Sequence, residues 1–303
     1  MKPVKLFAVF LLTLSVLSAA EAPFYFLKTK GDYAALNSAI VATFKAADYK
    51  IGENRDMVGP FKKQFGNSYF ERYNLINVHS KKHVSTLSAI DANIGAFAPF
   101  TIATYEKDGF FYAGFLKPKT MGEILGMKGG AKELAAYEKE NIALLNKALP
   151  GAQVHDPAYK PKNSGKPYLV RYDYDTEGED PAGLKDDLEM MLEGEFDVNG
   201  FVIANYNNLH DQLTNKAGFD LYSTYSICKL SVFYVVTKTR PEAGVFGPCT
   251  FAVYQLKGDN KAIMIYPSVY NWIDHLSIDD GEAIDQLLKA EALIEASLQK
   301  ITE

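Results

Sequence analysis

The sequence predicts an α+β fold made of two homologous halves, and three observations support this. Residues 95–118, GAFAPFTIATYEKDGFFYAGFLKP, recur as residues 244–267, GVFGPCTFAVYQLKGDNKAIMIYP. The same offset of 149 residues also pairs Tyr73 with Tyr222. Each half begins with a strand-like run of aromatic and branched residues and ends with a long amphipathic helical pattern. A repeat of this length is typical of a duplicated domain rather than of a solenoid.

Residues 1–20 have the three-part composition of a secretory signal peptide. Lys2 and Lys5 precede an apolar run over residues 6–17, and small residues follow at positions 18–20. The apolar run is shorter than the roughly 20 residues that cross a bilayer as a helix. The alternative is an uncleaved N-terminal anchor. We expect a mature protein that is exported, most simply to a bacterial periplasm, without a membrane span.

Composition narrows the class of protein. The formal net charge of the 303-residue chain is −5, and removal of residues 1–20 would take away two lysines and no acids. An acidic chain lacks the basic surface that gives most nucleic-acid affinity, so no nucleic-acid partner is expected. The hydrophobic content of 48% and aromatic content of 13% suit a globular chain with a full core.

The first half is expected over residues 21–149. A strand near residues 23–30 leads into an amphipathic helix whose apolar positions are Leu36, Ile40, Val41, Phe44 and Ala47. Further strands follow, and a tight turn at Asp108-Gly109 joins the last two of them. Residues 127–130 form the loop before a closing helix over residues 131–149.

The second half is expected over residues 167–303, after a linker over residues 150–166 that is rich in Pro, Gly and Lys. A strand at 167–174 leads into a helix capped by Asp180, with Pro181 in its first turn. Antiparallel strands with a turn at Gly258-Asp259 precede a closing helix at 281–301. Two such α+β copies would pack about a pseudo-two-fold axis.

The second half resembles the domain-of-unknown-function family 302. Residues 199–230 and 242–255 carry the resemblance, at the positions Cys228, Pro248, Cys249 and Tyr254. The first half matches only through its likeness to the second, which identifies the chain as a tandem-repeat member. The resemblance implies a compact fold of strand, helix, four strands and helix, and it implies little about function. The sequence departs from the family pattern at Lys229-Leu230 and Thr250, where Asn-Pro and Asn are common.

The two cysteines are the most informative polar positions. Cys228 ends one predicted strand and Cys249 begins the next. In an oxidising compartment they are expected to form a disulfide, but two unpaired buried thiols and a working thiol site, redox or metal-binding, stay open. The first half has His79 and Phe100 at the equivalent positions, so only one copy can use thiols. The first copy is then either a scaffold or a product of drift after duplication.

Other motifs point to no catalytic chemistry. His79 and His83 lie four residues apart in a strand-rich region, where roughly 13 Å separates such side chains, so we expect a solvated basic loop rather than a shared metal site. No phosphate-binding glycine loop, nucleophile elbow or zinc signature occurs in the sequence. No catalytic residue, cofactor or metal ligand is therefore assigned.

The preferred interpretation is an exported, non-catalytic protein that binds a small or apolar ligand in a cleft between its halves, or that assists a periplasmic protein partner. The alternative is a thiol-based redox or metal-binding protein that uses Cys228 and Cys249. In that case Pro248, Tyr254 and His275 are candidate neighbours of the thiols. The abundant tyrosines are expected mainly in the core, although tyrosines can also line a ligand cavity.

Overall fold

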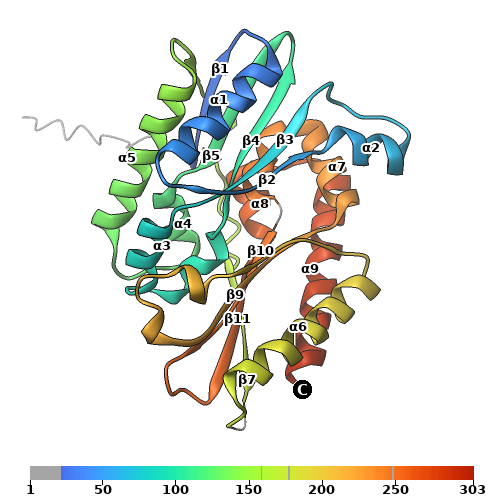
Figure 1. The fold of residues 1–303 in the computed structure, drawn as a ribbon. Helices are drawn as coiled ribbons and strands as arrows, with labels where there is room; N and C mark the ends of the chain where they lie inside the picture. Colours follow the sequence, from blue (N-terminus) through green and yellow to red (C-terminus); the bar gives the residue numbers. More distant parts are fainter. Residues whose placement is uncertain (1–21, 158, 177, 248) are drawn as a thin grey trace, which may run out of the picture.

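The computed structural model describes residues 22–157, 159–176, 178–247 and 249–303, so the predicted signal peptide lies outside the described residues. Two antiparallel sheets with helices packed on them form the molecule, which confirms the predicted α+β class (Figure 1). Within the described ranges, no helix has the length and apolar character needed to cross a bilayer.

The first sheet has six strands in the order β2-β3-β4-β5-β1-β6. Its helices α1 and α5 pack against each other, and α5 also contacts α3 and α4. In chain order its elements are β1 (Phe24–Thr29), α1 (Tyr33–Ala46), β2 (Lys50–Asp56), α2 (Val58–Phe65), β3 (Tyr73–His79), α3 (Lys81–Ser88), the 3-10 helix η1 (Ala92–Phe97), β4 (Phe100–Lys107), β5 (Phe110–Leu116), α4 (Pro118–Ile124), α5 (Ala131–Ala148) and β6 (Gln153–His155).

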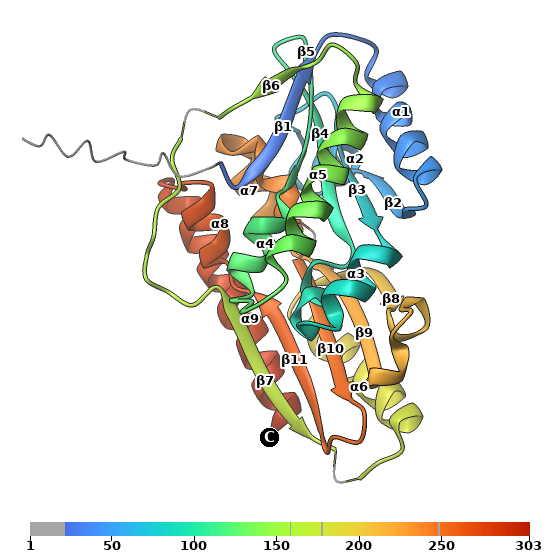
Figure 2. The ribbon, with the colours of Figure 1, turned by 90° about the vertical axis from the view of Figure 1, so that its left-hand side faces the viewer.

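The second sheet has five strands in the order β7-β11-β10-β9-β8 and lies below the first in Figures 1 and 2. Its long helices α6 and α9 pack together. In chain order its elements are β7 (Leu169–Asp175), α6 (Pro181–Val198), β8 (Val202–Asn208), the 3-10 helices η2 (His210–Gln212) and η3 (Lys216–Gly218), β9 (Phe219–Cys228), α7 (Leu230–Thr239), the 3-10 helix η4 (Pro241–Phe246), β10 (Cys249–Leu256), β11 (Lys261–Pro267), α8 (Tyr270–His275) and α9 (Gly281–Thr302).

The two sheets share one strand order when strands are numbered within each half. In both, the first strand lies beside the fifth, and the second strand is at the opposite edge. The first sheet has one additional edge strand, β6, which pairs with β1. This strand lies in residues 150–166, which the sequence predicts as an irregular linker. The linker is therefore partly fixed to the first sheet.

Local sequence signals explain several element boundaries. Asp180 caps α6 by accepting hydrogen bonds from Ala182 N and Gly183 N, and Pro181 begins the helix, as predicted. Asp108 and Gly109 have φ angles of 52° and 70°, which the two-residue turn between β4 and β5 requires. These signals are local, so they are visible in the sequence without knowledge of the packing.

The prediction of a solvated loop around His79 and His83 was wrong. His79 ends β3 with its side chain buried, and His83 lies in the first turn of α3. Ser80 caps this helix because its hydroxyl accepts a hydrogen bond from His83 N at 3.4 Å. Val84 and Leu87 then face the core, which holds the short helix against the sheet. Lys81 and Lys82 made this segment look like a polar loop, although its later residues follow the pattern of an amphipathic helix.

The halves contact each other through reciprocal hydrogen bonds. In the first half, Tyr73 Oη donates to Pro241 O at 2.5 Å and accepts from Gly244 N at 3.1 Å. In the second, Tyr222 Oη donates to Ala92 O and accepts from Gly95 N at 2.9 Å. Each sheet thus holds the 3-10 helix of the other half. A constant offset of 149 residues relates every atom pair of one contact to the other.

Candidate ligand cavity between the halves

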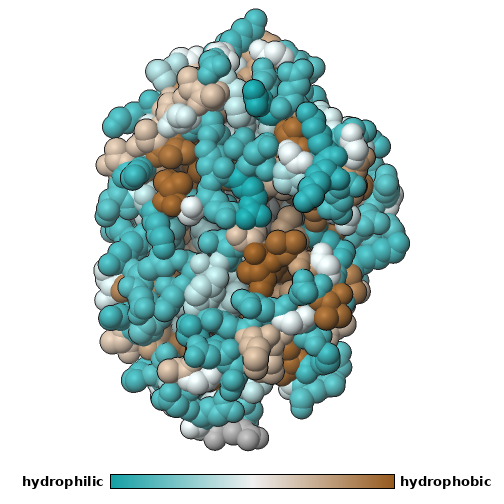
Figure 3. All heavy atoms as spheres, turned by 45° about the vertical axis from the view of Figure 1, so that its right-hand side comes forward, coloured by the Kyte–Doolittle hydropathy of each residue, from teal (hydrophilic) through white to brown (hydrophobic). Residues whose placement is uncertain are grey.

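A cavity of about 140 Å³, here named the interface cavity, lies where the two sheets meet. Both halves contribute to it through β2, β3 and α2 on one side and β8, β9 and α7 on the other. Figure 3 shows hydrophobic side chains gathered near the middle of one face of the molecule, among polar ones. The lining residues are Glu53, Arg55, Met57, Pro60, Leu75, Asn77, Val202, Ala204, Cys228 and Leu230.

A second cavity of about 40 Å³, here named the core cavity, is lined by second-half residues and by Leu75 of the first half. It shares two lining residues, Leu75 and Cys228, with the interface cavity, so these side chains separate the two spaces. Its walls are apolar and include Trp272, the single tryptophan of the chain. The other lining residues are Phe201, Ile227, Lys229, Val232, Phe233, Gly247, Cys249, Val269, Leu287, Ala290 and Ile294.

The interface cavity has a small polar end. Arg55 forms a two-pronged ion pair with Glu53, with Nε–Oε2 at 2.9 Å and Nη2–Oε1 at 3.0 Å. Arg55 Nη2 also donates to Ala204 O at 3.1 Å, which joins the two halves. Asn77 lines the same cavity. An apolar cavity with a few convergent polar groups is the usual form of a small-molecule site.

Both predicted cysteines lie at these cavities. Cys228 lines both spaces and Cys249 lines the core cavity, and each is a free thiol in the structure. Cys249 pairs with Ile227 in the sheet, so Cys228 lies one position along β9 from that pair. Burial raises the pKa of Cys228 to about 11. Burial and the neighbouring Cys228 raise the pKa of Cys249 to about 12, so both thiols are protonated at neutral pH. A disulfide between them stays a prediction.

Of the three candidate neighbours of the thiols, Tyr254 and His275 line neither cavity. Pro248 lies outside the described residues. Tyr254 is five positions along β10 from Cys249, and its hydroxyl donates to Asn93 Oδ1 at 2.9 Å. His275 lies in α8 with its ring beside Phe246, and burial lowers its pKa. These side chains serve the packing between and within the halves.

The first half has different groups at the positions equivalent to the cysteines. Phe100 stands where Cys249 does, and its ring packs against Tyr137 and Phe115 with centroid distances of 5.8 and 6.1 Å. His79 stands where Cys228 does, is buried, and has no hydrogen-bond partner for either ring nitrogen among the described residues. The first half thus has a packed phenyl ring at this position, whereas the second half has a smaller thiol that borders a cavity.

The described residues contain no group of three or more His, Cys, Asp or Glu side chains placed to hold a metal ion. His83 instead pairs with Glu140, at 3.0 Å between Nε2 and Oε2, and stacks on Tyr137 with a centroid distance of 4.5 Å. With both thiols protonated, the thiolate form that binds metals is also disfavoured.

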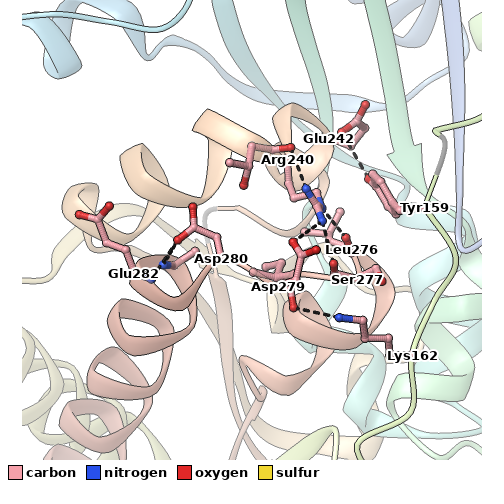
Figure 4. Close-up of polar contacts among 12 residues, drawn as sticks. Tyr159, Lys162, Arg240, Glu242, Leu276, Ser277, Asp279, Asp280 and Glu282 are labelled. Carbon is pink, nitrogen blue, oxygen red and sulfur yellow. Dashed lines mark hydrogen bonds and ion pairs between the residues drawn. The ribbon is translucent and has the colours of Figure 1, made fainter.

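A buried acidic cluster lies away from the cavities. Glu242 accepts a hydrogen bond from Tyr159 Oη at 3.3 Å, as Figure 4 shows. It also accepts one from Tyr105 Oη at 3.0 Å, and His155 Nε2 lies 3.5 Å from its carboxylate. Burial opposes its charge, but the hydrogen bonds from His155 and Tyr105 leave its pKa lowered. Nearby, Arg240 binds the carbonyls of Leu276 and Ser277. Since Glu242 is fully partnered, this cluster fastens the linker and holds the halves together.

Two larger grooves lie on the outside of single halves. One, of about 640 Å³, runs between α4 and α5 and is bordered by charged residues such as Glu123 and Lys139. The other, of about 770 Å³, lies between α6 and β8. Both are more open to solvent than the interface cavity, so they would remove less of a small molecule from water. Enclosure, not volume, makes the interface cavity the stronger site.

The sequence did not single out the first-half residues of the site. Arg55, Leu75 and Asn77 belong to a half that lacks cysteines, and Trp272 lies in a helix that was not predicted. One signal was available for Asn77. It lies two positions before His79, which aligns with Cys228, and in a strand residues two apart share a face.

Comparisons with known proteins give a distant likeness among solved structures. No protein-family model and no curated protein matches the chain. Among solved structures, the chain is similar to an uncharacterized conserved protein, DUF302, from Bacillus stearothermophilus, with 13% sequence identity and a TM-score of 0.39. The match covers 42% of this chain and 98% of that one. At this identity and TM-score, the likeness supports no argument about this chain.

Proposed function

We propose that this protein binds one small, mainly apolar molecule in the interface cavity, without catalysis. The observation that carries the proposal is the cavity itself, since side chains from both halves line it. An apolar molecule bound there would remove the apolar walls from water. It would also contact both halves and tie them together.

The size of the cavity limits the ligand. A cavity of about 150 Å³ lined by apolar side chains holds one benzene molecule. The interface cavity has about 140 Å³, and the adjoining core cavity adds about 40 Å³. The ligand is therefore about the size of a substituted benzene, with its far end between Leu75 and Cys228.

The proposal includes the origin and location of the protein. We infer that the two halves are duplicated domains of the DUF302 type that pack about a pseudo-two-fold axis. The shared strand order, the constant offset and the reciprocal tyrosine contacts support this inference. The composition of residues 1–20 supports export to a periplasm. Such a protein would meet its ligand outside the cytoplasm.

Fluorescence of Trp272 provides the test, because this residue lines the core cavity and is the single tryptophan. Toluene should change its emission in a saturable way. In Ala204→Phe the new ring would occupy the interface cavity, so toluene affinity should fall by at least about tenfold. Val198→Phe, at a side chain that is 83% exposed, should bind toluene as the unchanged protein does. Equal binding by both variants would contradict the proposal.

A thiol-based function is the second candidate, because Cys228 and Cys249 border the same cavity. The raised pKa values of both thiols weigh against it, since the thiolate is the reactive form.

Cys228→Ser and Cys249→Ser separate the two candidates. A binding protein should keep its toluene response in each single variant, because a hydroxyl is close in size to a thiol. Intact mass of the unchanged protein, measured with and without reductant, reports on the alternative. A toluene response that requires both thiols, or a bound metal lost on denaturation, would favour the thiol function.

A further inference from the structure

The polar end of the interface cavity restricts the chemistry of the ligand, and this inference rests on the proposed function. We infer that the ligand carries an uncharged hydrogen-bonding group, such as an amide or a hydroxyl, and that Asn77 recognises it. A carboxylate or another anion is excluded although an arginine lines the cavity. Three features of the described residues lead to this conclusion.

The first feature is the Asn77 side chain. It lines the interface cavity and is only 3% exposed. Among the described residues, none exchanges a hydrogen bond with its amide, although its backbone pairs with Thr101 in the sheet. Its amide atoms are not among the buried polar atoms that lack both a partner and solvent contact, so water in the cavity can solvate them until a ligand takes its place. A ligand group that both accepts and donates would satisfy this amide.

The second feature is the charge balance. Glu53 and Arg55 are the charged residues that line the interface cavity, and they already neutralise each other through two hydrogen bonds. Arg55 Nη2 also donates to Ala204 O. An anionic ligand would have to displace Glu53 or lie beside its carboxylate. A neutral group would neither displace Glu53 nor be repelled by its carboxylate.

The third feature is that Lys229, the lysine that lines the core cavity, already has partners. Its Nζ donates to Asn199 O at 2.6 Å and lies 5.0 Å from the centre of the Phe201 ring. Its charge is therefore already engaged. The apolar end of the cavity has Leu75 and Cys228, with a protonated thiol that carries no charge. The ligand is thus a neutral molecule with one polar end.

Toluene, benzamide and benzoate test this inference, because they share one ring and differ in the polar group. At pH 7, benzamide should bind at least about tenfold more tightly than benzoate. Asn77→Leu should weaken benzamide by about threefold to tenfold and leave toluene unchanged or tighter. This variant should fold, since it replaces an unpartnered amide with a side chain of similar shape. Asn205→Leu, a neighbouring amide that does not line the cavity, should change neither affinity.

Glu53→Gln tests the charge argument separately. It removes the partner of Arg55, so benzoate should gain affinity relative to benzamide. Three results would overturn the inference: benzoate binding as tightly as benzamide in the unchanged protein, an unaltered ratio of benzamide to toluene affinity in Asn77→Leu, or no gain for benzoate in Glu53→Gln. Absence of toluene binding would instead defeat the proposed function, and this inference with it.

Discussion

At the scale of single residues, His79 is a buried histidine whose environment lowers its pKa. It occupies the position of Cys228 in the first half and is buried with both ring nitrogens unpartnered. Burial, helped by the charge of Lys50, lowers its pKa from 6.5 to about 4. The imidazole is therefore neutral in the folded protein over a pH range where the unfolded chain would bind a proton.

This difference predicts a pH dependence of stability. Since the folded pKa is lowered, the contribution of His79 is complete above pH 6.5 and is lost as the pH falls toward 4, by up to about 3 kcal/mol. His79→Leu should flatten the decline in the free energy of unfolding over this range, measured by urea denaturation. The matched control is His210→Leu, at a more exposed histidine, which should keep the slope. An equally steep decline in His79→Leu would contradict the assignment.

The candidate site could be predicted only in part at this scale. Cys228 and Cys249 were visible because two cysteines in a long chain are conspicuous, and both border the cavities. Asn77 and Arg55 were not, because their role depends on the packing of one half against the other. Spacing within a strand cannot show which groups a distant segment will enclose.

At the scale of elements, the 3-10 helices η1 and η4 connect the halves. Their glycines allow a tyrosine of the opposite sheet to approach the backbone closely. A Cβ added at Gly244 would lie 2.4 Å from Tyr73 Oη and 2.7 Å from Ala103 Cβ. At Gly95 it would lie 2.5 Å from Tyr222 Oη. The repeated Gly in the duplicated segment therefore has a steric cause.

Gly244→Ala should destabilise the protein by about 1–3 kcal/mol, because Tyr73 cannot move without losing its bonds to Pro241 and Gly244. Gly194→Ala serves as the control in α6, where nothing lies within 4 Å of the added Cβ. It should stabilise by up to about 1 kcal/mol, as expected for Ala in place of Gly in a helix. Chemical denaturation of both variants and of the unchanged protein measures the difference in the free energy of unfolding. Equal stability of the two variants would show that the contact carries no strain.

Long elements with periodic patterns were predicted well, and short ones were not. The closing helices, the helix capped by Asp180 and the turn at Asp108-Gly109 follow from local signals. The short helices α2, α3, α4, α7 and α8 were missed. Packing against the rest of the fold stabilises helices of this length more than intrinsic propensity does, so their sequences carry weak patterns.

At the scale of the whole molecule, two similar halves contribute unequally to one site. The second half provides the thiols, the tryptophan and most apolar walls, while the first contributes Arg55, Asn77 and Leu75. Phe100 of the first half stands at the position equivalent to Cys249, so a large ring in one copy corresponds to a small thiol in the other. In the second half, the small side chain at this position borders the core cavity.

The most direct test of the central claim is a crystal structure of the full chain soaked with bromobenzene, with the anomalous signal of bromine marking its position. The account predicts one strong peak in the interface cavity, among Leu75, Asn77 and Cys228, or just beyond in the core cavity. That peak should disappear in Ala204→Phe. A cavity that stays empty while bromine occupies the groove between α4 and α5 would contradict the proposed binding site.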